Sequence, residues 1–534
     1  MGRSAFCAIV LASVATAFAR TAPTRSSPEA VTRAGIVRGM RVPALPDGAA
    51  FLGIPYAAAP VGALRWQPPR PARAWIGVRK TVQYGPACPQ VPANWLPYPV
   101  WSEDCLFLNI WTSKPSSAAR LPVIVYFHGG GNVAGYGQLT PLGPPLARLG
   151  VVVVTANYRL GPFGFFAHPA LTAASPHESS GNYGLLDQIA LLRWVRSNIS
   201  AFGGDPKRVT VMGQSAGGFD ICLLMTSPLA RGLFHAAIVE SGDCESALLA
   251  DMRTPIHFSG IEGSGYSNGE RLAADLGVKA GPGAVRSLRA ISAARILSVW
   301  RHDPRLQFGA IVDGWVIRKQ PASVFARGEQ ARVPVLVGSN ADEATVFGPG
   351  PQTLADYWKY LRHDTGPFAK QEFRLWPAYS NARVHREFLE LQSGMFAYGA
   401  WSMARSMARI DEPSYLYRLT WVDAGKRAPL GAEHGEELYF LSDRFPGDWQ
   451  PMKDQGRFGE MLRRYWTDFA KTGHPSAPGL PGWPAFDSRS HPLLELGSQV
   501  RPMPVSPELQ RIQTLMRPIL EPGTMVDFAA KDMR

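Results

Sequence analysis

A serine stands between two glycines where an expected strand meets an expected helix. The β-branched run 208–212 predicts a buried strand, and residues 216–225 carry apolar side chains that suit a helix. Between them lies GQSAG, a G-x-S-x-G pattern centred on Ser215. Reversing the chain within one residue strains the serine backbone, and the flanking glycines let both segments approach without Cβ clashes. The sequence therefore predicts a nucleophile elbow at Ser215.

A second copy of the pattern, residues 265–269, lacks this context. With 53 glycines in 534 residues, roughly 0.3 copies are expected by chance, so the pattern alone decides nothing. No strand-like run precedes Ser267, and Ser267 with Glu270 has the S-x-x-E spacing of a capping box. Ser267 is therefore predicted to cap a helix.

A second junction of a strand with glycines precedes the elbow. Leu121–Phe127 predicts a buried strand that runs directly into His128 and three glycines. Consecutive glycines after a strand expose backbone N–H groups, which can bind the oxyanion that forms when a serine attacks a carbonyl. The two junctions in this order are more specific than either alone, and they favour a serine hydrolase.

Composition narrows the class of protein and of partner. A hydrophobic content of 46% excludes a disordered chain. Length suggests several domains, but no repeat, charge block or low-complexity tract marks a boundary. The net charge of +13 could attract anionic substrates, yet no Lys/Arg run or nucleic-acid motif concentrates it. We therefore expect a diffuse surface charge and no nucleic-acid partner.

The N-terminus has the features of a secretory signal. Arg3 precedes an apolar run of roughly 15 residues that ends in Ala17-Phe18-Ala19, which predicts a signal peptide over residues 1–19. This run is shorter than the about 20 residues that span a bilayer, and no later segment is long and apolar enough. We expect a periplasmic or secreted protein without a stable membrane anchor.

Export would place the cysteines in an oxidising compartment, where disulfides form. In an oxidising compartment, Cys88 and Cys105 are expected to form a disulfide that closes a short loop. Cys222 lies in the apolar stretch ICLLM, which predicts a buried free thiol, and Cys244 has no assigned role. None of these cysteines forms a metal-type C-x-x-C pair.

Several segments together resemble the signatures of the type-B carboxylesterase/cholinesterase family of α/β-hydrolases, and in character the chain is closest to bacterial para-nitrobenzyl esterases. They are FLGIPYAAAPVG (51–62), SEDCLFLNIW (102–111), YFHGGG (126–131), NYRLGPFGF (157–165), WVRSNISAFGGDPKRVTVMGQSAGG (194–218) and FAKTGHP (469–475). The resemblance implies one catalytic domain over residues 20–534, with a central, mostly parallel twisted sheet flanked by helices and insertions around a deep pocket. It also implies hydrolysis of small-molecule carboxylic esters without a metal or organic cofactor.

The resemblance also implies a catalytic triad in the order Ser, acid, His. Val333–Val337 predicts a strand, and in the segment after it the family's acid corresponds to Glu343, with the adjacent Asp342 as the alternative. Five histidines follow Glu343, and the family's general base corresponds to His434. The other four are expected on exposed helices or before prolines.

Further roles follow from the same resemblance. The backbone N–H groups of Gly130, Gly131 and Ala216 are expected to form the oxyanion hole. Ser241 and Glu437 match positions that support the triad. The acidic residues after His434 lack the H-E-x-x-H spacing of a zinc site, so no metal is expected.

The substrate pocket is predicted from four positions. Trp95 matches the tryptophan that stacks on the ammonium group of choline esters in cholinesterases. The family's choline hydrolysers, however, have a glutamate at the position of Gln214 and an aromatic residue at that of Val346, although Phe347 follows. A choline ester is therefore disfavoured.

We expect a carboxylesterase of broad specificity that acts on esters of uncharged or aromatic alcohols. The positive net charge suggests polyanionic esters as an alternative. A different class is a catalytically inactive binding or adhesion protein of this family, but such proteins typically lack a triad member. The sequence does not distinguish a monomer from a dimer.

Overall fold

The computed structural model describes most of the chain after residue 25. The described residues are 26–93, 96–245, 247–258, 261–422, 428–444, 453–487, 489–504 and 507–520. The predicted signal peptide (1–19) and Trp95 lie outside them. Among the helices of the described residues, none is long and apolar enough to cross a bilayer.

Strands and helices alternate along much of the chain. The strands are β1 (Glu29–Thr32), β2 (Gly35–Arg38), β3 (Met40–Val42), β4 (Leu45–Pro55), β5 (Val78–Lys80), β6 (Phe107–Thr112), β7 (Leu121–Phe127), β8 (Val152–Ala156), β9 (Gly204–Gln214), β10 (Ala236–Glu240), β11 (Ala250–Asp251), β12 (Ile256–Phe258), β13 (Ile261–Gly263), β14 (Ile311–Val312), β15 (Val335–Asn340), β16 (Ser414–Leu419), β17 (Leu493–Leu496) and β18 (Val500–Met503). The α-helices are α1 (Gly143–Ala147), α2 (Gly161–Gly164), α3 (Pro169–Ala173), α4 (Tyr183–Asn198), α5 (Ala216–Thr226), α6 (Gly265–Asp275), α7 (Ala284–Ala290), α8 (Ala293–His302), α9 (Pro321–Ala326), α10 (Leu354–Thr365), α11 (Ala369–Leu375), α12 (Asn381–Ala408), α13 (Glu436–Ser442), α14 (Lys453–Thr472) and α15 (Pro507–Leu520). The 3₁₀ segments are η1 (Gly62–Leu64), η2 (Ile199–Phe202), η3 (Pro228–Ala230), η4 (Glu343–Val346), η5 (Gly366–Phe368) and η6 (Ala428–Leu430).

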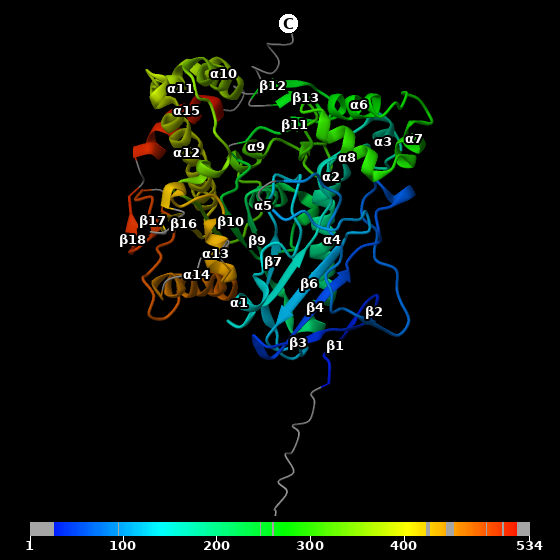
Figure 1. Cartoon of the computed structure of the whole chain (residues 1–534). Coiled ribbons are helices and arrows are strands. Elements are labelled where there is room, and N and C mark those ends of the chain that lie inside the picture. The colour runs from blue at the N-terminus through cyan, green and yellow to red at the C-terminus, as the bar shows by residue number, and fades with distance from the viewer. Residues whose placement is uncertain are drawn as a thin grey trace, which may run out of the picture.

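One large sheet organises the molecule (Figure 1). Within the described residues it has 11 strands in the order β18-β17-β16-β15-β10-β9-β7-β8-β6-β4-β3. Neighbouring strands are parallel from β17 to β8, whereas β18 at one end and β6, β4 and β3 at the other pair antiparallel. The predicted α/β class with a central, mostly parallel sheet is confirmed.

Both faces of this sheet are buried, which explains why its central strands are continuous apolar runs. Along β7, Val123 and Val125 join the core on the side of α4 and α5, whereas Ile124 and Tyr126 join the core on the side of α14. Alternate side chains of a strand point to opposite faces, so an uninterrupted apolar run is needed when helices cover both.

The parallel strands bring three segments of the chain to one edge of the sheet. β9 lies between β7 and β10, and β10 lies between β9 and β15. Their carboxyl ends therefore point the same way, and ligands of open α/β sheets bind outside these ends. The glycine-rich segment follows β7, Ser215 follows β9, and Glu343 follows β15.

Ser267 belongs to a capping box, but its predicted place in the box is wrong. Helix α6 begins at Gly265, and its N-cap is Ser264, whose Oγ accepts the Ser267 N–H at 3.1 Å. The Ser267 Oγ in turn accepts the Ser264 N–H at 2.7 Å. The extended backbone of Ser264 starts the helix one turn earlier than the S-x-x-E spacing indicated.

The structure contains two disulfides. The predicted bridge between Cys88 and Cys105 is confirmed, with Cα atoms 5.0 Å apart. The prediction that Cys222 is a free thiol is wrong, because Cys222 in α5 is bonded to Cys244, which follows β10. α5 packs against β10, so their ends bring the two cysteines together although 22 positions separate them. An apolar helical stretch indicates burial of a thiol but not its oxidation state.

We expect none of these four cysteines to react with a thiol reagent when the protein, isolated without reductant, is denatured. After reduction all four are expected to react. Peptide mapping of the non-reduced protein should join Cys88 to Cys105 and Cys222 to Cys244. Alkylation of Cys222 and Cys244 without reductant would contradict the second bridge.

Candidate active site

Ser215 sits on a strained turn between β9 and α5. Its backbone has φ 56° and ψ −125°, which residues other than glycine rarely adopt. Its N–H donates to the carbonyl oxygen of Glu240 at 2.8 Å, which ties the turn to β10. A Cβ on Gly213 would lie 2.5 Å from the carbonyl carbon of Gly217, and a Cβ on Gly217 would clash with the carbonyl oxygen of Phe127, so both flanking glycines are sterically required. The predicted strand, turn and helix are confirmed.

Glu343 and His434 are joined by a short hydrogen bond. Glu343 begins η4 just beyond β15 and is fully buried, and its Oε2 lies 2.5 Å from His434 Nδ1. Its Oε1 accepts the backbone N–H of Asn340 at 2.6 Å. An ionised carboxylate only accepts hydrogen bonds, so Nδ1 carries a proton and Nε2 of the neutral ring is the acceptor. This is the tautomer that a general base needs.

The other imidazole nitrogen faces the end of β9. His434 Nε2 lies 3.0 Å from Nε2 of Gln214, the residue just before Ser215. Ser215 Oγ has no hydrogen bond to His434 in the part of the chain that the structure describes. Such bonds are often long or poorly aligned in the absence of substrate. The structure thus brings the three predicted side chains to one edge of the sheet.

Opposing effects act on the charge of His434. Burial lowers the pKa of the imidazole, but the negative charge of Glu343 and its hydrogen bond raise it, and the net pKa lies above its ordinary value. Glu437 raises it further. The neutral ring, which is the form that accepts a proton, therefore forms at higher pH than in a free histidine.

Asp342, the alternative acid, has a different contact. Its Oδ2 accepts the backbone N–H of Ala432 at 2.8 Å, and its own N–H donates to the carbonyl oxygen of Ala432 at 2.9 Å. Asp342 therefore holds the segment that carries His434 by bonding to the backbone of Ala432, not to the imidazole. Glu343 is the carboxylate that contacts the ring.

The glycine-rich segment approaches the serine closely. A Cβ on Gly129 would lie 3.0 Å from Ser215 Cβ. Gly130 and Gly131 have φ of 105° and 64°, and Ala216 is the first residue of α5. None of the N–H groups of Gly130, Gly131 and Ala216 donates to another residue that the structure describes. Three such groups near one serine, one of them at a helix N-terminus, suit an oxyanion.

A buried carboxyl group that sequence reasoning missed anchors this segment. Asp220 accepts Asn132 Nδ2 at 2.8 Å on one oxygen and Gln188 Nε2 at 2.5 Å on the other. It thereby joins the glycine-rich segment to α4 and α5, and burial raises its pKa to about 7. An acid inside the apolar run 216–225 was the signal that could have revealed it.

Two further buried glutamates, Glu437 and Glu240, lie near the Glu343–His434 pair. Asn340 Nδ2 donates to Glu437 Oε2 at 2.5 Å, and Trp466 Nε1 donates to Glu240 Oε1 at 2.7 Å. Burial and the charge of Glu343 raise the pKa of Glu437 to about 7, and burial and Glu437 raise that of Glu240. Ser241 is buried beside Glu240. Sequence reasoning named Glu437 and Ser241 but not Glu240.

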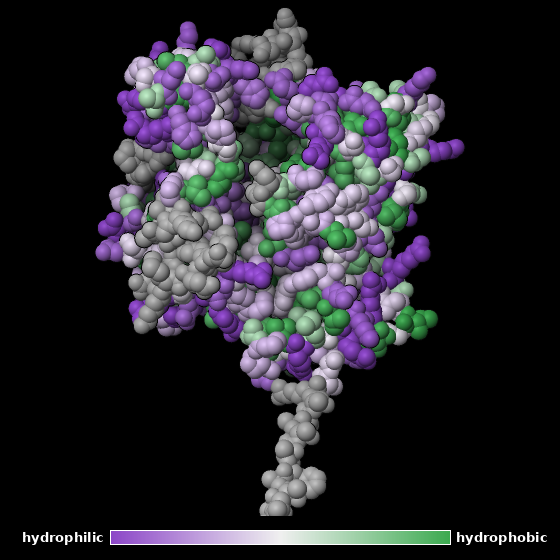
Figure 2. Space-filling model, viewed as in Figure 1, coloured by the Kyte–Doolittle hydropathy of each residue, from purple (hydrophilic) through white to green (hydrophobic). Residues whose placement is uncertain are grey.

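Aromatic rings flank the imidazole. The ring centroids of Phe347 and Phe396 lie 4.9 and 5.2 Å from that of His434. Phe396, on α12, was not predicted. Val346 is 43% exposed at the end of η4, the segment that Glu343 begins. Figure 2 shows a hollow between the regions of α10–α12 and α6–α8, with hydrophobic side chains inside and hydrophilic ones on its rim.

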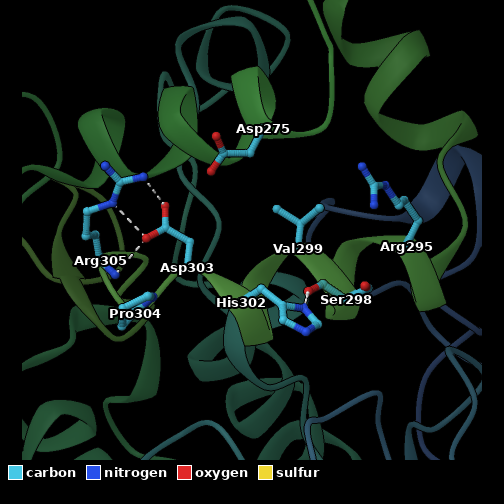
Figure 3. Close-up of a pocket in the computed structure, with 8 residues that line it drawn as sticks. All are labelled: Asp275, Arg295, Ser298, Val299, His302, Asp303, Pro304 and Arg305. Atoms are coloured by element: carbon cyan, nitrogen blue, oxygen red, sulfur yellow. Dashed lines mark hydrogen bonds and ion pairs between the residues drawn. The ribbon is translucent and has the colours of Figure 1, made fainter.

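A separate pocket of about 620 Å³ contains none of the predicted site residues (Figure 3). Arg305 is paired with Asp303 at 2.8 Å, and His302 Nδ1 lies 2.6 Å from the carbonyl oxygen of Ser298. Its lining residues are Asp275, Arg295, Ser298, Val299, His302, Asp303, Pro304 and Arg305. In the described part of the chain, no group of three or more His, Cys, Asp or Glu side chains is arranged to hold a metal ion.

Comparison with known proteins covers nearly the whole described chain. The profile of the carboxylesterase family matches residues 26–515. Fumonisin B1 esterase of Sphingopyxis macrogoltabida is 37% identical over 484 residues, 88% of this chain and 86% of that protein. Liver carboxylesterase 1 of Oryctolagus cuniculus is 32% identical over 84% of this chain and 86% of its own. A PNB esterase structure has a TM-score of 0.77 at 31% identity and covers 92% of this chain and 100% of its own.

Proposed function

Because the chain belongs to the carboxylesterase family and is a carboxylic ester hydrolase with the α/β-hydrolase fold, we propose that it acts through a Ser215–His434–Glu343 triad and an acyl-enzyme intermediate. The observation that carries this proposal is the buried Glu343 hydrogen-bonded to His434, beside a serine on a strained turn. The broad-specificity assignment rests on the aromatic side chains at the imidazole and on the likeness to PNB esterases.

In the acylation step, Ser215 Oγ attacks the ester carbonyl while His434 Nε2 takes its proton. Glu343 holds the tautomer and stabilises the imidazolium. The carbonyl oxygen becomes an oxyanion, which the N–H groups of Gly130, Gly131 and Ala216 bind. The tetrahedral intermediate collapses as the bond to the alcohol oxygen breaks, and the imidazolium protonates the leaving alcohol.

Deacylation repeats the sequence with water in place of serine. His434 takes a proton from the water as it attacks the acyl carbonyl, and the same N–H groups bind the second oxyanion. Breaking the bond to Ser215 Oγ releases the acid, and the proton returns from His434 to Ser215. No other group is required for the balance of atoms and charge.

A set of para-nitrophenyl and alkyl esters, varied separately in acyl and alcohol parts, tests this function. We expect turnover of several members, with a burst of nitrophenol equal to one per enzyme where deacylation is slow. A serine-directed organophosphate should abolish turnover. Neither turnover nor covalent adduct would favour the non-catalytic binding protein.

A carboxylate-bearing ester is a second candidate substrate. A relative 37% identical to this chain is named for fumonisin B1, which we propose as one compound to test. The net charge of +13 would attract an anionic ester, and Gln214 places a neutral amide beside the serine.

We expect added salt to lower the rate of hydrolysis of anionic esters but not that of neutral esters. Between about 0.01 and 1 M salt, the screening length falls from about 30 to 3 Å. The kcat/KM for para-nitrophenyl hemisuccinate should fall by about 10-fold or more over this range, whereas that for para-nitrophenyl butyrate should stay constant. The two esters are similar in length and share a leaving group. Equal salt responses would remove the anionic candidate.

We also propose export to the periplasm or the medium after cleavage behind Ala19. Two disulfides in the structure support this, since such bonds persist mainly in oxidising compartments. The N-terminal sequence of the exported protein is expected to begin at Arg20. A mature protein that retains residues 1–19 would contradict the proposal.

A further inference from the structure

The amide nitrogen of Gln214 lies beside the proposed general base. Gln214 Nε2 lies 3.0 Å from His434 Nε2, while Gln214 Oε1 faces Gly129, where a Cβ would lie 2.9 Å away. Gln214 is 6% exposed. Because Nδ1 of the neutral ring donates to Glu343, Nε2 accepts, and the amide N–H donates to it.

This hydrogen bond distinguishes the two charge states of the ring. Nε2 of the neutral imidazole has a lone pair that the amide N–H can approach. In the imidazolium, Nε2 carries a proton, so a donor would face a donor at 3.0 Å. The hydrogen bond from Gln214 therefore stabilises the neutral ring, and it cannot form when the ring is charged.

The other groups around His434 act in the opposite direction or are uncharged. Glu343 on η4 and Glu437 on α13 favour the imidazolium through their negative charge. Phe347 on η4 and Phe396 on α12 present apolar rings. Gln214, at the end of β9, is the polar group in hydrogen-bond contact with Nε2 among the residues that the structure describes.

We propose that Gln214 is a positioning residue that favours the neutral form of His434, releases the single Nε2 lone pair to the Ser215 hydroxyl when the proton is transferred, and so extends ester hydrolysis to more acidic pH. This inference rests on the proposed function, in which His434 Nε2 takes the serine proton. The amide opposes the two carboxylates, which would otherwise keep the ring charged at a pH where the base must be free. A glutamate at position 214 would add a third carboxylate beside the ring.

The test measures the titration of His434 by NMR in histidine-labelled Ser215→Ala protein, where turnover plays no part. The His434 signal is assigned from its loss in a His434→Asn variant. In Gln214→Met, which keeps the size but removes the donor, we expect the midpoint to rise by roughly 0.5–1 pH unit. In Gln214→Glu, we expect a rise of about 1–3 units, because a nearby negative charge favours the imidazolium.

The same substitutions with Ser215 in place should move the acidic limb of kcat/KM upward in the same order. Gln330→Met, the same change at a buried glutamine that bonds to the Ser406 carbonyl oxygen, is the matched control and should leave the His434 midpoint unchanged. An unmoved or lowered His434 midpoint in Gln214→Met would overturn the inference, whatever the midpoint in Gln214→Glu, because the added charge raises the latter by itself. If Gln214→Met does not fold, Gln214→Leu, which also removes the donor without adding a charge, takes its place. Full activity of Ser215→Ala would instead overturn the proposed function.

Discussion

Replacing Ser215 with alanine is expected to lower kcat for a para-nitrophenyl ester by on the order of 10⁶-fold. The reason is that Ser215 Oγ is the atom that carries the acyl group in the proposed mechanism, and alanine has no hydroxyl to replace it. Alanine has the same Cβ as serine, so the turn at φ 56° is no more strained, and the folded protein should persist. Initial rates, with circular dichroism and a thermal melt on the same sample, check both parts.

Ser267 offers a matched control, because it is the serine of the second G-x-S-x-G pattern. Ser267→Ala removes one acceptor from the capping box of α6 and should cost about 1 kcal/mol of stability or less. Activity is expected to remain that of the original protein. If Ser267→Ala were inactive and Ser215→Ala active, the wrong serine would have been assigned.

Replacing Glu343 with glutamine is expected to lower kcat by about 10⁴-fold. The change keeps the size of the side chain but removes the charge that stabilises the imidazolium. An amide N–H facing Nδ1 would also favour the tautomer in which Nε2 carries the proton and cannot accept one from Ser215. Measured at a pH where the original enzyme is fully active, kcat should fall while KM changes little.

The neighbouring carboxylate is the control for this substitution. Asp342→Asn keeps an oxygen that accepts the Ala432 N–H, so we expect kcat within about 10-fold of the original value. Each of the two variants loses one negative charge, and the two positions are adjacent. A difference in kcat between the variants therefore reports the contact between Glu343 and His434. A larger loss in Asp342→Asn than in Glu343→Gln would reassign the acid.

Local sequence signals predicted the parts of the fold that depend on local physics. The apolar run 121–127 became β7 with the same bounds, and the glycines around Ser215 proved to be sterically required. The helix near Ser267 begins one turn earlier than predicted, because Ser264 and Ser267 hydrogen-bond to each other. Such reciprocal caps are not distinguished by spacing alone.

Contacts between segments far apart in the sequence were harder to predict. The family resemblance predicted that Glu343 and His434 are catalytic residues. It did not predict that Gln214 contacts the same imidazole ring. Asp220, Glu240 and Phe396 act through partners many positions away, and only Asp220 has a local signal, as an acid within an apolar run. The bond between Cys222 and Cys244 depends on where α5 and the segment after β10 meet.

The site of covalent labelling by a diethyl phosphoryl reagent, determined by peptide mass spectrometry, tests most directly whether Ser215 is the nucleophile. We expect one phosphoryl group per chain, carried by Ser215, with loss of activity in proportion to labelling. We also expect His434→Ala to be labelled at a rate lower by several orders of magnitude, because the serine then lacks its base. Stoichiometric inactivation with the phosphoryl group on any residue other than Ser215 would contradict the assignment of the nucleophile.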